Sequence, residues 1–277
     1  MEILRYAAFT TDPAGGNPAG VVLDASGVSS AEMLAVAASV GYAETAFLTP
    51  RSDGALDVRY FSPLAEVPFC GHATIAAAVA YAARHGVGAL RFETLIGTVR
   101  VATRADAGVV TATLTTVPPT VAELAGLDEL LACLRWAAGD LDPALPPRVA
   151  FAGAHHPIIA AASRARLAHL DYDFDALGAL MAAQRWTTVD LVWRESTTVF
   201  HARNPFPPGG FVEDPATGAA AAAFGGYLRA LELVPLPATL TIHQGEDLGR
   251  PGVITVDVPA EPHSGISVSG TAVPIRG

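Results

Sequence analysis

Two stretches of small apolar residues stand out in the hydrophobic pattern of the chain. One runs from Ile75 to Tyr81 and the other from Gly218 to Phe224, and neither contains a charged residue. A helix that is apolar on all sides is a buried helix, and alanine side chains allow a sheet to pack close to it. The pattern therefore predicts two buried central helices.

The segments around these two helices repeat one another. In each half a Pro-containing segment precedes an Ala-Thr pair, and strands around a glycine follow the helix: 60–69, Ala73-Thr74 and 92–101, then 200–212, Ala216-Thr217 and 240–258. Matching order in two halves indicates duplication. The sequence thus predicts an α+β fold of two pseudo-symmetric half-barrel domains, each a curved, mostly antiparallel sheet around one Ala-rich helix.

The domain boundary is expected near residue 118. An amino-terminal half-barrel of residues 1–118 precedes a carboxyl-terminal half-barrel of 119–265, and a length of 277 residues suits two domains. The Pro- and Ala-rich segment 118–150 is interpreted as the crossover. The sequence leaves open whether the final strand, within 266–277, completes the first domain. A further helix is predicted over 31–40, with N-caps available just before it.

The net charge limits the classes of binding partner that are expected, and the cysteine content bears on the cellular compartment. A formal net charge of −10 repels phosphate backbones and anionic lipids, so neither nucleic acid nor a membrane surface is an expected partner. A small carboxylic acid is not excluded, because backbone N–H groups bind anions locally. Two cysteines and an amino terminus without a signal-peptide pattern favour the cytoplasm.

Three side chains are candidates for acid/base chemistry: Glu44, His72 and Asp214. Glu44 lies in an apolar strand entrance, where burial would raise its pKa and let it take and give a proton. A strand-end Glu that points to solvent is the plainer interpretation. His72 and Asp214 stand at the starts of the two central helices, where unpaired N–H groups bind carboxylates. Asp214 is equally suited to cap its helix.

Other chemistry finds less support. Cys70 precedes a helix start and could be a nucleophile, but the second half has no matching cysteine, which favours a small buried side chain. The eight histidines include His155-His156 but show no metal-ligand spacing, and no glycine-rich phosphate loop occurs. Neither a metal nor an organic cofactor is therefore predicted.

Several motifs together resemble the phenazine-biosynthesis isomerases and their relatives (PhzF-like), which have the diaminopimelate epimerase fold. The matching segments are Gly16-Asn17-Pro18-Ala19, Ala43-Glu44-Thr45-Ala46-Phe47, Arg59-Tyr60-Phe61-Ser62-Pro63, Glu66-Val67-Pro68-Phe69-Cys70-Gly71-His72-Ala73-Thr74, Glu213-Asp214-Pro215-Ala216-Thr217-Gly218, Gln244-Gly245 and Gly249-Arg250-Pro251. The second half departs from the family pattern at His201-Ala202-Arg203-Asn204-Pro205. The resemblance covers nearly the whole chain.

The resemblance implies an active site between the domains, a homodimer, and catalysis without metal or cofactor. The residue matching Glu44 would move a proton between carbons of a small carboxylic acid, assisted by those matching His72 and Asp214. Asn17, Gly71, Ala73, Gly218 and Ala219 would bind the substrate. Members that act on dihydro-hydroxyanthranilate tend to carry Ser where Ala219 stands, which weakens the case for that substrate.

Two other functions stay open at this point. An epimerase or racemase would need a second base opposite Glu44, and Asp214 is the candidate for it. A non-catalytic small-acid binder of the same fold would be expected to lose Glu44 or His72, and the sequence keeps both.

Overall fold

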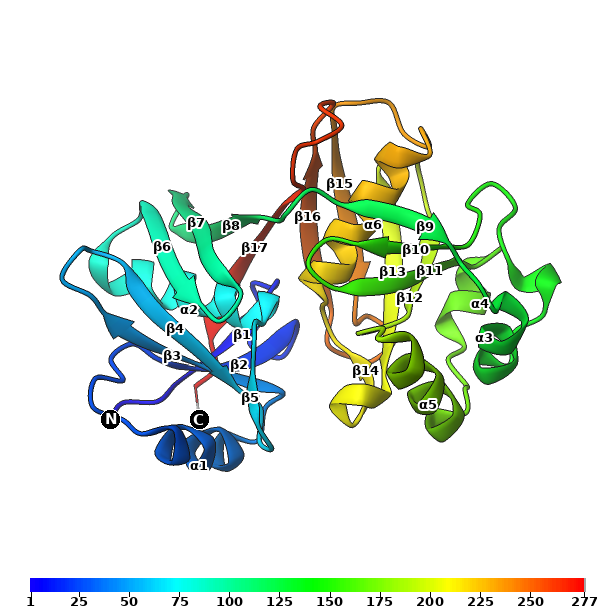
Figure 1. The fold of residues 1–277 in the computed structure, drawn as a ribbon. Helices are drawn as coiled ribbons and strands as arrows, with labels where there is room; N and C mark the ends of the chain where they lie inside the picture. Colours follow the sequence, from blue (N-terminus) through cyan, green and yellow to red (C-terminus); the bar gives the residue numbers. More distant parts are fainter. Residues whose placement is uncertain (277) are drawn as a thin grey trace. The chain divides into compact units, whose positions relative to one another are not determined.

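The computed structural model describes residues 1–276, which form two compact units (Figure 1). Unit 1 contains Met1–Thr115 and the carboxyl-terminal segment from Ser269, and unit 2 contains Thr116–Val268. The last strand, β17 (Ser267–Pro274), pairs with β1 in unit 1, so the chain leaves this unit once and returns to it. No helix among residues 1–276 is both long and apolar enough to cross a bilayer.

The strands of unit 1 close into a ring. Its other elements are β1 (Leu4–Ala8), β2 (Asn17–Val22), α1 (Ser30–Val40), β3 (Glu44–Pro50), β4 (Leu56–Phe61), β5 (Glu66–Val67), α2 (Gly71–His85), β6 (Ala89–Thr94), β7 (Gly97–Asp106) and β8 (Val109–Thr115). The ring runs β1-β2-β3-β4-β6-β7-β8-β17 and back to β1. Its parallel pairs, β2–β3 and β4–β6, are each joined through a helix, as parallel strands require.

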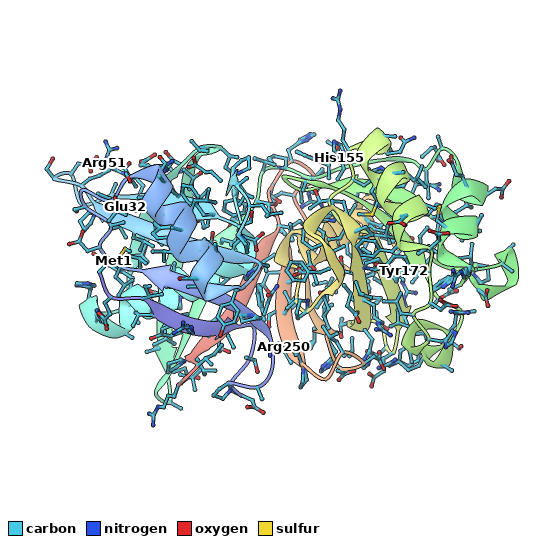
Figure 2. The ribbon with its side chains drawn as sticks, turned by 90° about the horizontal axis from the view of Figure 1, so that it is seen from below. Met1, Glu32, Arg51, His155, Tyr172 and Arg250 are labelled. Carbon is cyan, nitrogen blue, oxygen red and sulfur yellow. The ribbon has the colours of Figure 1, made fainter. Side chains whose placement is uncertain are left out.

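Helix α2 fills the inside of this ring. It packs against β1, β2, β3, β7 and β8, and its alanines from Ala73 to Ala80 are fully buried. Helix α1 instead packs outside, against β3 and β4. A capping box fixes its start: the Glu32 amide donates to Ser29 Oγ, and the Ser29 amide donates to the Glu32 carboxylate. Figure 2 labels Glu32 on this helix. The predicted central helix of the first half is confirmed.

Unit 2 has a second curved sheet around a second buried helix. Its elements are β9 (Thr120–Glu123), α3 (Leu127–Leu134), η1 (Ala138–Asp140), β10 (Arg148–Phe151), β11 (His155–Ala160), α4 (Arg164–Ala168), α5 (Phe174–Gln184), β12 (Asp190–Arg194), β13 (Val199–Phe206), η2 (Pro207–Gly209), β14 (Phe211–Asp214), α6 (Gly218–Ala230), β15 (Ala238–Gln244) and β16 (Gly252–Val258). The strand order is β9-β10-β11-β12-β13-β15-β16. Helix α6 contacts both ends of this order, at β9 and at β16, so the sheet curves around it.

The interpretation of 118–150 as a simple crossover is wrong. This segment supplies β9 and β10, which belong to the sheet of unit 2, and helix α3. Leu130, Leu134 and Trp136 join one hydrophobic cluster with Leu177 and Met181 of α5. Its strands are only four residues long, which is too short for the alternation that reveals strands in a sequence.

The two units repeat the same connections. In both, a parallel strand pair is joined through outer helices, β2–β3 and β11–β12, and a second pair through the central helix, β4–β6 and β13–β15. In each unit a bidentate Arg–Glu pair joins the two strands of a hairpin. Arg59 pairs with Glu66 across β4 and β5, and Arg203 pairs with Glu213 across β13 and β14. The register places Glu44 and Asp190 at the first position of equivalent strands.

Asp190 ends a buried polar chain in unit 2. His156 Nδ1 lies 2.9 Å from Thr188 Oγ1, which donates to Asn204 Oδ1 at 2.6 Å, and Asn204 Nδ2 donates to Asp190 Oδ1 at 3.0 Å. Because the Thr188 hydroxyl gives its proton to Asn204, it accepts one from His156. Burial raises the pKa of Asp190 from 3.8 to about 7 and lowers that of His156 from 6.5 to about 4.

Replacing Asp190 with Asn should remove one source of pH-dependent stability. The folded state holds the Asp190 proton more tightly than the unfolded state, so this stability is present in acid and is lost as pH rises from about 4 to about 7. We expect the free energy of unfolding of the native chain, minus that of Asp190→Asn, to fall by about 1.4 kcal/mol per pH unit between about pH 5 and 7.

Tryptophan fluorescence during urea unfolding is a suitable measurement, because Trp136, Trp186 and Trp193 all lie in unit 2. His156 is present in both proteins, so its titration cancels in the difference. Parallel stability curves for the two proteins over this pH range would show that Asp190 is ionised in the folded state.

Candidate active site

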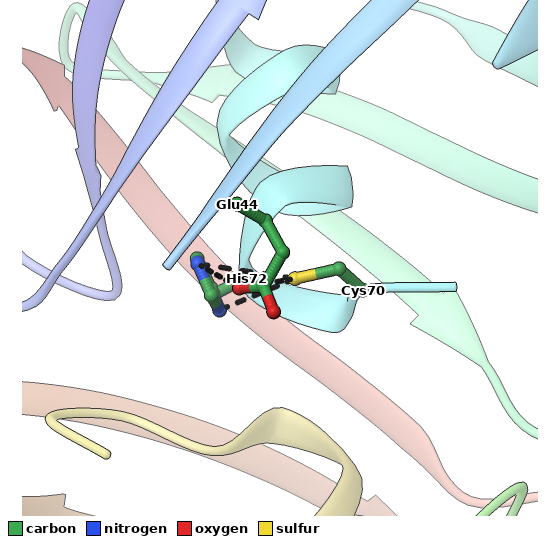
Figure 3. Close-up of side chains that lie close together, drawn as sticks. All are labelled: Glu44, Cys70 and His72. Atoms are coloured by element: carbon green, nitrogen blue, oxygen red, sulfur yellow. Dashed lines mark hydrogen bonds and ion pairs between the residues drawn. The ribbon is translucent and has the colours of Figure 1, made fainter. Parts of the chain in front are cut away.

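Three chemically distinct side chains meet at the start of β3 and α2 in unit 1 (Figure 3). The Cys70 thiol lies 3.5 Å from Glu44 Oε2 and 3.4 Å from His72 Nδ1. His72 Nε2 lies 3.4 Å from the same Glu44 oxygen. The Glu44 side chain is 14% exposed, so it is not directed into solvent as an isolated strand-end glutamate would be.

The His72 imidazole is neutral. Burial lowers its pKa from 6.5 to about 3, because a low-polarity environment disfavours the charged ring. Because the neutral ring carries no charge, its 3.4 Å contact with the Glu44 carboxylate is not an ion pair. Asn17 Nδ2 lies 3.1 Å from His72 Nδ1. If the amide donates there, the ring proton is on Nε2 and faces the Glu44 carboxylate.

Two side-chain hydrogen bonds, one from Thr74 in α2 and one from Tyr60 in β4, hold the turn before α2. Thr74 Oγ1 donates to the Cys70 carbonyl at 2.6 Å and lies 2.7 Å from the Tyr60 hydroxyl, which must then be the donor. Tyr60 is fully buried, and burial raises its pKa. A threonine and a tyrosine thus fix the backbone that carries Cys70 and His72.

Helix α2 begins without a side-chain cap. Cys70 occupies the N-cap position and makes no capping hydrogen bond, whereas Ser29, Ser163 and Asp173 cap α1, α4 and α5. Gly71 is the first residue of α2, and Ala73 is buried two positions later. The first N–H groups of a helix have no partner within it, so this end can accept a carboxylate.

The predicted residues of the second half gather at the start of α6, in unit 2. Asp214 is the last residue of β14 and is 7% exposed. Its carboxylate accepts a 2.6 Å hydrogen bond from Thr217 Oγ1. Gln244 Nε2 donates to the Asp214 carbonyl at 2.7 Å, and Gln244 Oε1 accepts from the Thr217 amide at 2.9 Å. A buried glutamine at the end of β15 therefore holds the turn.

The interpretation of Asp214 as the N-cap of α6 is wrong. Thr217 is the N-cap, and it makes no side-chain capping bond because its hydroxyl donates to Asp214. Gly218 and Ala219 are the first two residues of the helix, and Ala219 is half-buried. Gly245 allows this close packing, since a Cβ there would lie 2.7 Å from the Pro215 carbonyl oxygen.

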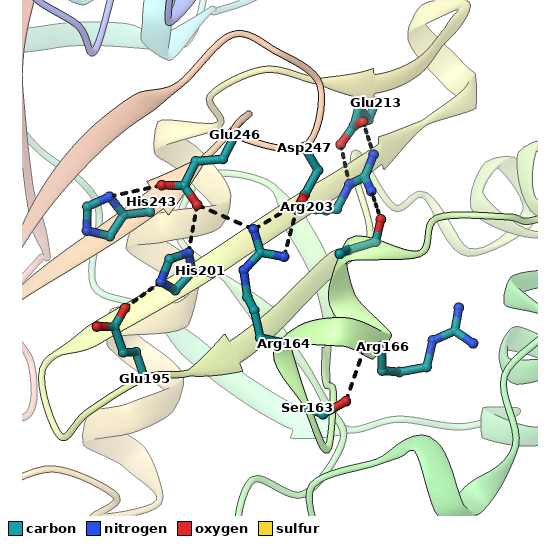
Figure 4. A network of polar contacts seen from close by, with 11 residues as sticks. Ser163, Arg164, Arg166, Glu195, His201, Arg203, Glu213, His243, Glu246 and Asp247 are labelled. Atoms are coloured by element: carbon teal, nitrogen blue, oxygen red, sulfur yellow. Dashed lines mark hydrogen bonds and ion pairs between the residues drawn. The ribbon is translucent and has the colours of Figure 1, made fainter.

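A second polar cluster of unit 2 braces its sheet (Figure 4). The His201 ring lies between two carboxylates, with Nε2 2.6 Å from Glu195 and Nδ1 2.9 Å from Glu246. Arg164 contacts Glu246 and Asp247. Glu195 and Glu246 are 52% and 38% exposed, so water screens these contacts and each contributes little to stability. We assign this cluster a structural role.

Two residues that the sequence does not single out as site residues, Cys70 and Gln244, take part in these contacts. The prediction of Cys70 as a small buried side chain is confirmed in its burial, but its thiol also contacts both Glu44 and His72. The sequence presents Gln244 only as part of the Gln244-Gly245 motif, and its buried contacts with Asp214 and Thr217 depend on the tertiary structure. Among residues 1–276, Glu44, Cys70 and His72 are also the only group of three whose ligand atoms are close enough to share a metal ion.

Comparison with known proteins places the chain in a family. Residues 6–277 match PhzC-PhzF, the phenazine biosynthesis-like proteins. An uncharacterized isomerase of Deinococcus radiodurans is 34% identical, over 92% of this chain and 85% of the relative. The trans-2,3-dihydro-3-hydroxyanthranilate isomerase of Pseudomonas chlororaphis is 31% identical, over 96% of this chain and 94% of the relative.

Solved structures agree with this placement. A PhzF-family phenazine biosynthesis protein of Bacillus anthracis superposes with a TM-score of 0.90 at 27% identity, covering 100% of this chain and 98% of that one. A probable proline racemase of Agrobacterium radiobacter shares the fold, with a TM-score of 0.65 at 14% identity over 98% and 90% of the two chains. The predicted fold is confirmed, and the chain is a member of the PhzC-PhzF family of phenazine biosynthesis-like proteins, to which isomerases belong.

Proposed function

We propose that this protein is an isomerase that moves a proton between carbons of a small carboxylate-bearing metabolite, without a metal or an organic cofactor. The observation that carries the proposal is the contact of the Glu44 carboxylate with the neutral, buried His72. Relatives named as isomerases, at more than 30% identity over most of the chain, support the reaction class.

In the proposed reaction Glu44 abstracts a proton next to a conjugated or carbonyl-stabilised centre and returns it to another carbon. A neutral imidazole beside the carboxylate leaves it more basic than an imidazolium would, because a cation stabilises the charged form. In this proposal the Asn17 amide donates to His72 Nδ1, 3.1 Å away, which leaves the ring proton on Nε2, where it can polarise the substrate.

The substrate carboxylate would bind at uncapped helix starts. The amides near Gly71 in unit 1 and near Gly218 and Ala219 in unit 2 are the proposed donors. Asp214 would orient the substrate, with its carboxylate fixed by Thr217. A homodimer in the cytoplasm, as the family resemblance and composition suggest, completes the proposal.

Epimerisation of a small acid is the second candidate. It is favoured by one observation, a second largely buried carboxylate at Asp214. An epimerase needs a base on each face of one carbon, whereas the proposed isomerase needs Asp214 only for orientation.

Replacing Glu44 with Gln should abolish proton exchange. With trans-2,3-dihydro-3-hydroxyanthranilate as the probe in deuterated buffer, we expect solvent deuterium to enter the product, and the variant to slow this by about 10²–10⁴-fold, since general-base catalysis contributes that much. Mass spectrometry of the product measures the incorporation. Glu93→Gln, a half-buried glutamate elsewhere in unit 1, is the matched control. Exchange at the native rate in Glu44→Gln would remove Glu44 from the base role.

Replacing Ala219 with Ser should improve activity on the same probe. A hydroxyl at this helix start can add one hydrogen bond to the substrate, worth about 0.5–1.5 kcal/mol, so we expect kcat/KM to rise roughly 2- to 10-fold. Ala230→Ser, at the exposed end of the same helix, is the control. An unchanged or lower kcat/KM for Ala219→Ser would show that this residue does not face the probe.

Replacing Asp214 with Asn separates the two candidate functions. We expect the isomerase to keep measurable isomerisation, because the amide preserves the shape and can still accept from Thr217 Oγ1. An epimerase would instead lose exchange from one of two enantiomers while keeping it from the other, as followed by chiral chromatography. A chain that binds small acids from a metabolite extract without turning any of them over would contradict both candidates.

A further inference from the structure

The distances among the donor atoms of Glu44, Cys70 and His72 can be compared with the spacing of ligands around a zinc ion. A tetrahedral zinc ion with one sulfur, one nitrogen and one oxygen ligand separates those atoms by about 3.3–3.6 Å, as follows from its usual bond lengths. Here Sγ–Oε2 is 3.5 Å, Nε2–Oε2 is 3.4 Å and Sγ–Nε2 is 3.8 Å. The thiol also lies 3.4 Å from His72 Nδ1, beside the ring, so it has to turn toward Nε2 to share an ion with the other two atoms (Figure 3).

Hydrogen bonding alone explains this spacing less well. An N–H···O hydrogen bond is usually 2.7–3.2 Å long, so the 3.4 Å between His72 Nε2 and Glu44 Oε2 exceeds it. An ion in the middle of the three atoms would satisfy all of them at once. Thiolate, imidazole and carboxylate are also the protein ligands that zinc prefers.

The surroundings of His72 resemble those of a metal-bound histidine. Such a ring usually gives its second N–H to a neighbouring oxygen, which fixes its orientation. Asn17 lies 3.1 Å from His72 Nδ1, whereas Glu44 lies nearest to Nε2. In an ion-bound form Nε2 would give its lone pair to the metal, and Nδ1–H would donate to the Asn17 amide oxygen.

We propose that Glu44, Cys70 and His72 form a binding site for Zn²⁺ or a similar divalent ion, and that the bound ion inhibits the enzyme. Three protein ligands leave a fourth position open to water or to a substrate carboxylate. On binding, the thiol proton passes to solvent and the sulfur becomes a thiolate ligand. The ion would occupy the Glu44 oxygen that the proposed reaction needs. Binding does not depend on the proposed function, whereas inhibition does.

Cobalt titration tests the binding without any substrate. After purification in chelator, the full chain should bind one Co²⁺ and develop a thiolate-to-cobalt absorption band together with the visible bands of a tetrahedral site, and Zn²⁺ should abolish both. Cys70→Ala should lose the thiolate band. Cys133→Ala, which removes the only other cysteine and one that is equally buried, should keep it.

Two further variants keep the proposal testable if Cys70→Ala is unstable. His72→Gln should lose the tetrahedral bands, and Asn17→Ala should weaken Zn²⁺ binding by roughly 10- to 100-fold, as the loss of a ligand's orienting partner does. Binding at other than one ion per chain, or binding unchanged in Cys70→Ala and His72→Gln, would overturn the site. Binding of one ion without slower proton exchange would leave the site but overturn inhibition.

Discussion

Burial of the His72 imidazole is the constraint on which the polar group of unit 1 depends. A desolvated ring with a pKa of about 3 stays neutral at physiological pH, so it must use one nitrogen as an acceptor and the other as a donor. Asn17 and Glu44 lie at those two nitrogens. The carboxylate therefore has a polar neighbour that positions it without neutralising its charge, which suits a group that must accept a proton from carbon.

The sequence revealed the parts of the fold that depend on local pattern. The alanine runs predicted both central helices, and their flanking motifs predicted the duplication that the strand pairings display. The sequence pattern does not predict contacts between residues far apart in the chain. The role of Cys70 depends on Glu44, which is 26 residues away, and Thr217 displaces Asp214 as the helix cap only because Gln244 arrives from β15. Contacts of this kind leave no periodic pattern of hydrophobic residues from which they could be predicted.

Comparison of the two units explains why only one of them carries the proposed base. Glu44 and Asp190 begin equivalent strands, but their surroundings differ. Asp190 is 2% exposed and closes a chain of buried hydrogen bonds, so its carboxyl serves the interior of unit 2. Glu44 faces a histidine that the second half lacks, because the residue before its Ala-Thr pair is Pro215. A carboxyl group therefore stands at the start of the equivalent strand in both units, and the side chains around it differ between them: His72 and Cys70 around Glu44, Asn204 beside Asp190.

The two proposals for Glu44, proton transfer and metal binding, rest on the same packing of side chains around it. A neutral imidazole and a carboxylate held together away from water provide two good ligands for zinc, and this pair alone is common in acid/base sites. Cys70 adds a third ligand of the softer kind that zinc binds strongly. The thiol has no necessary part in the proposed reaction. In the proposed zinc site, Cys70 is therefore the residue that can be changed to test metal binding separately from isomerisation.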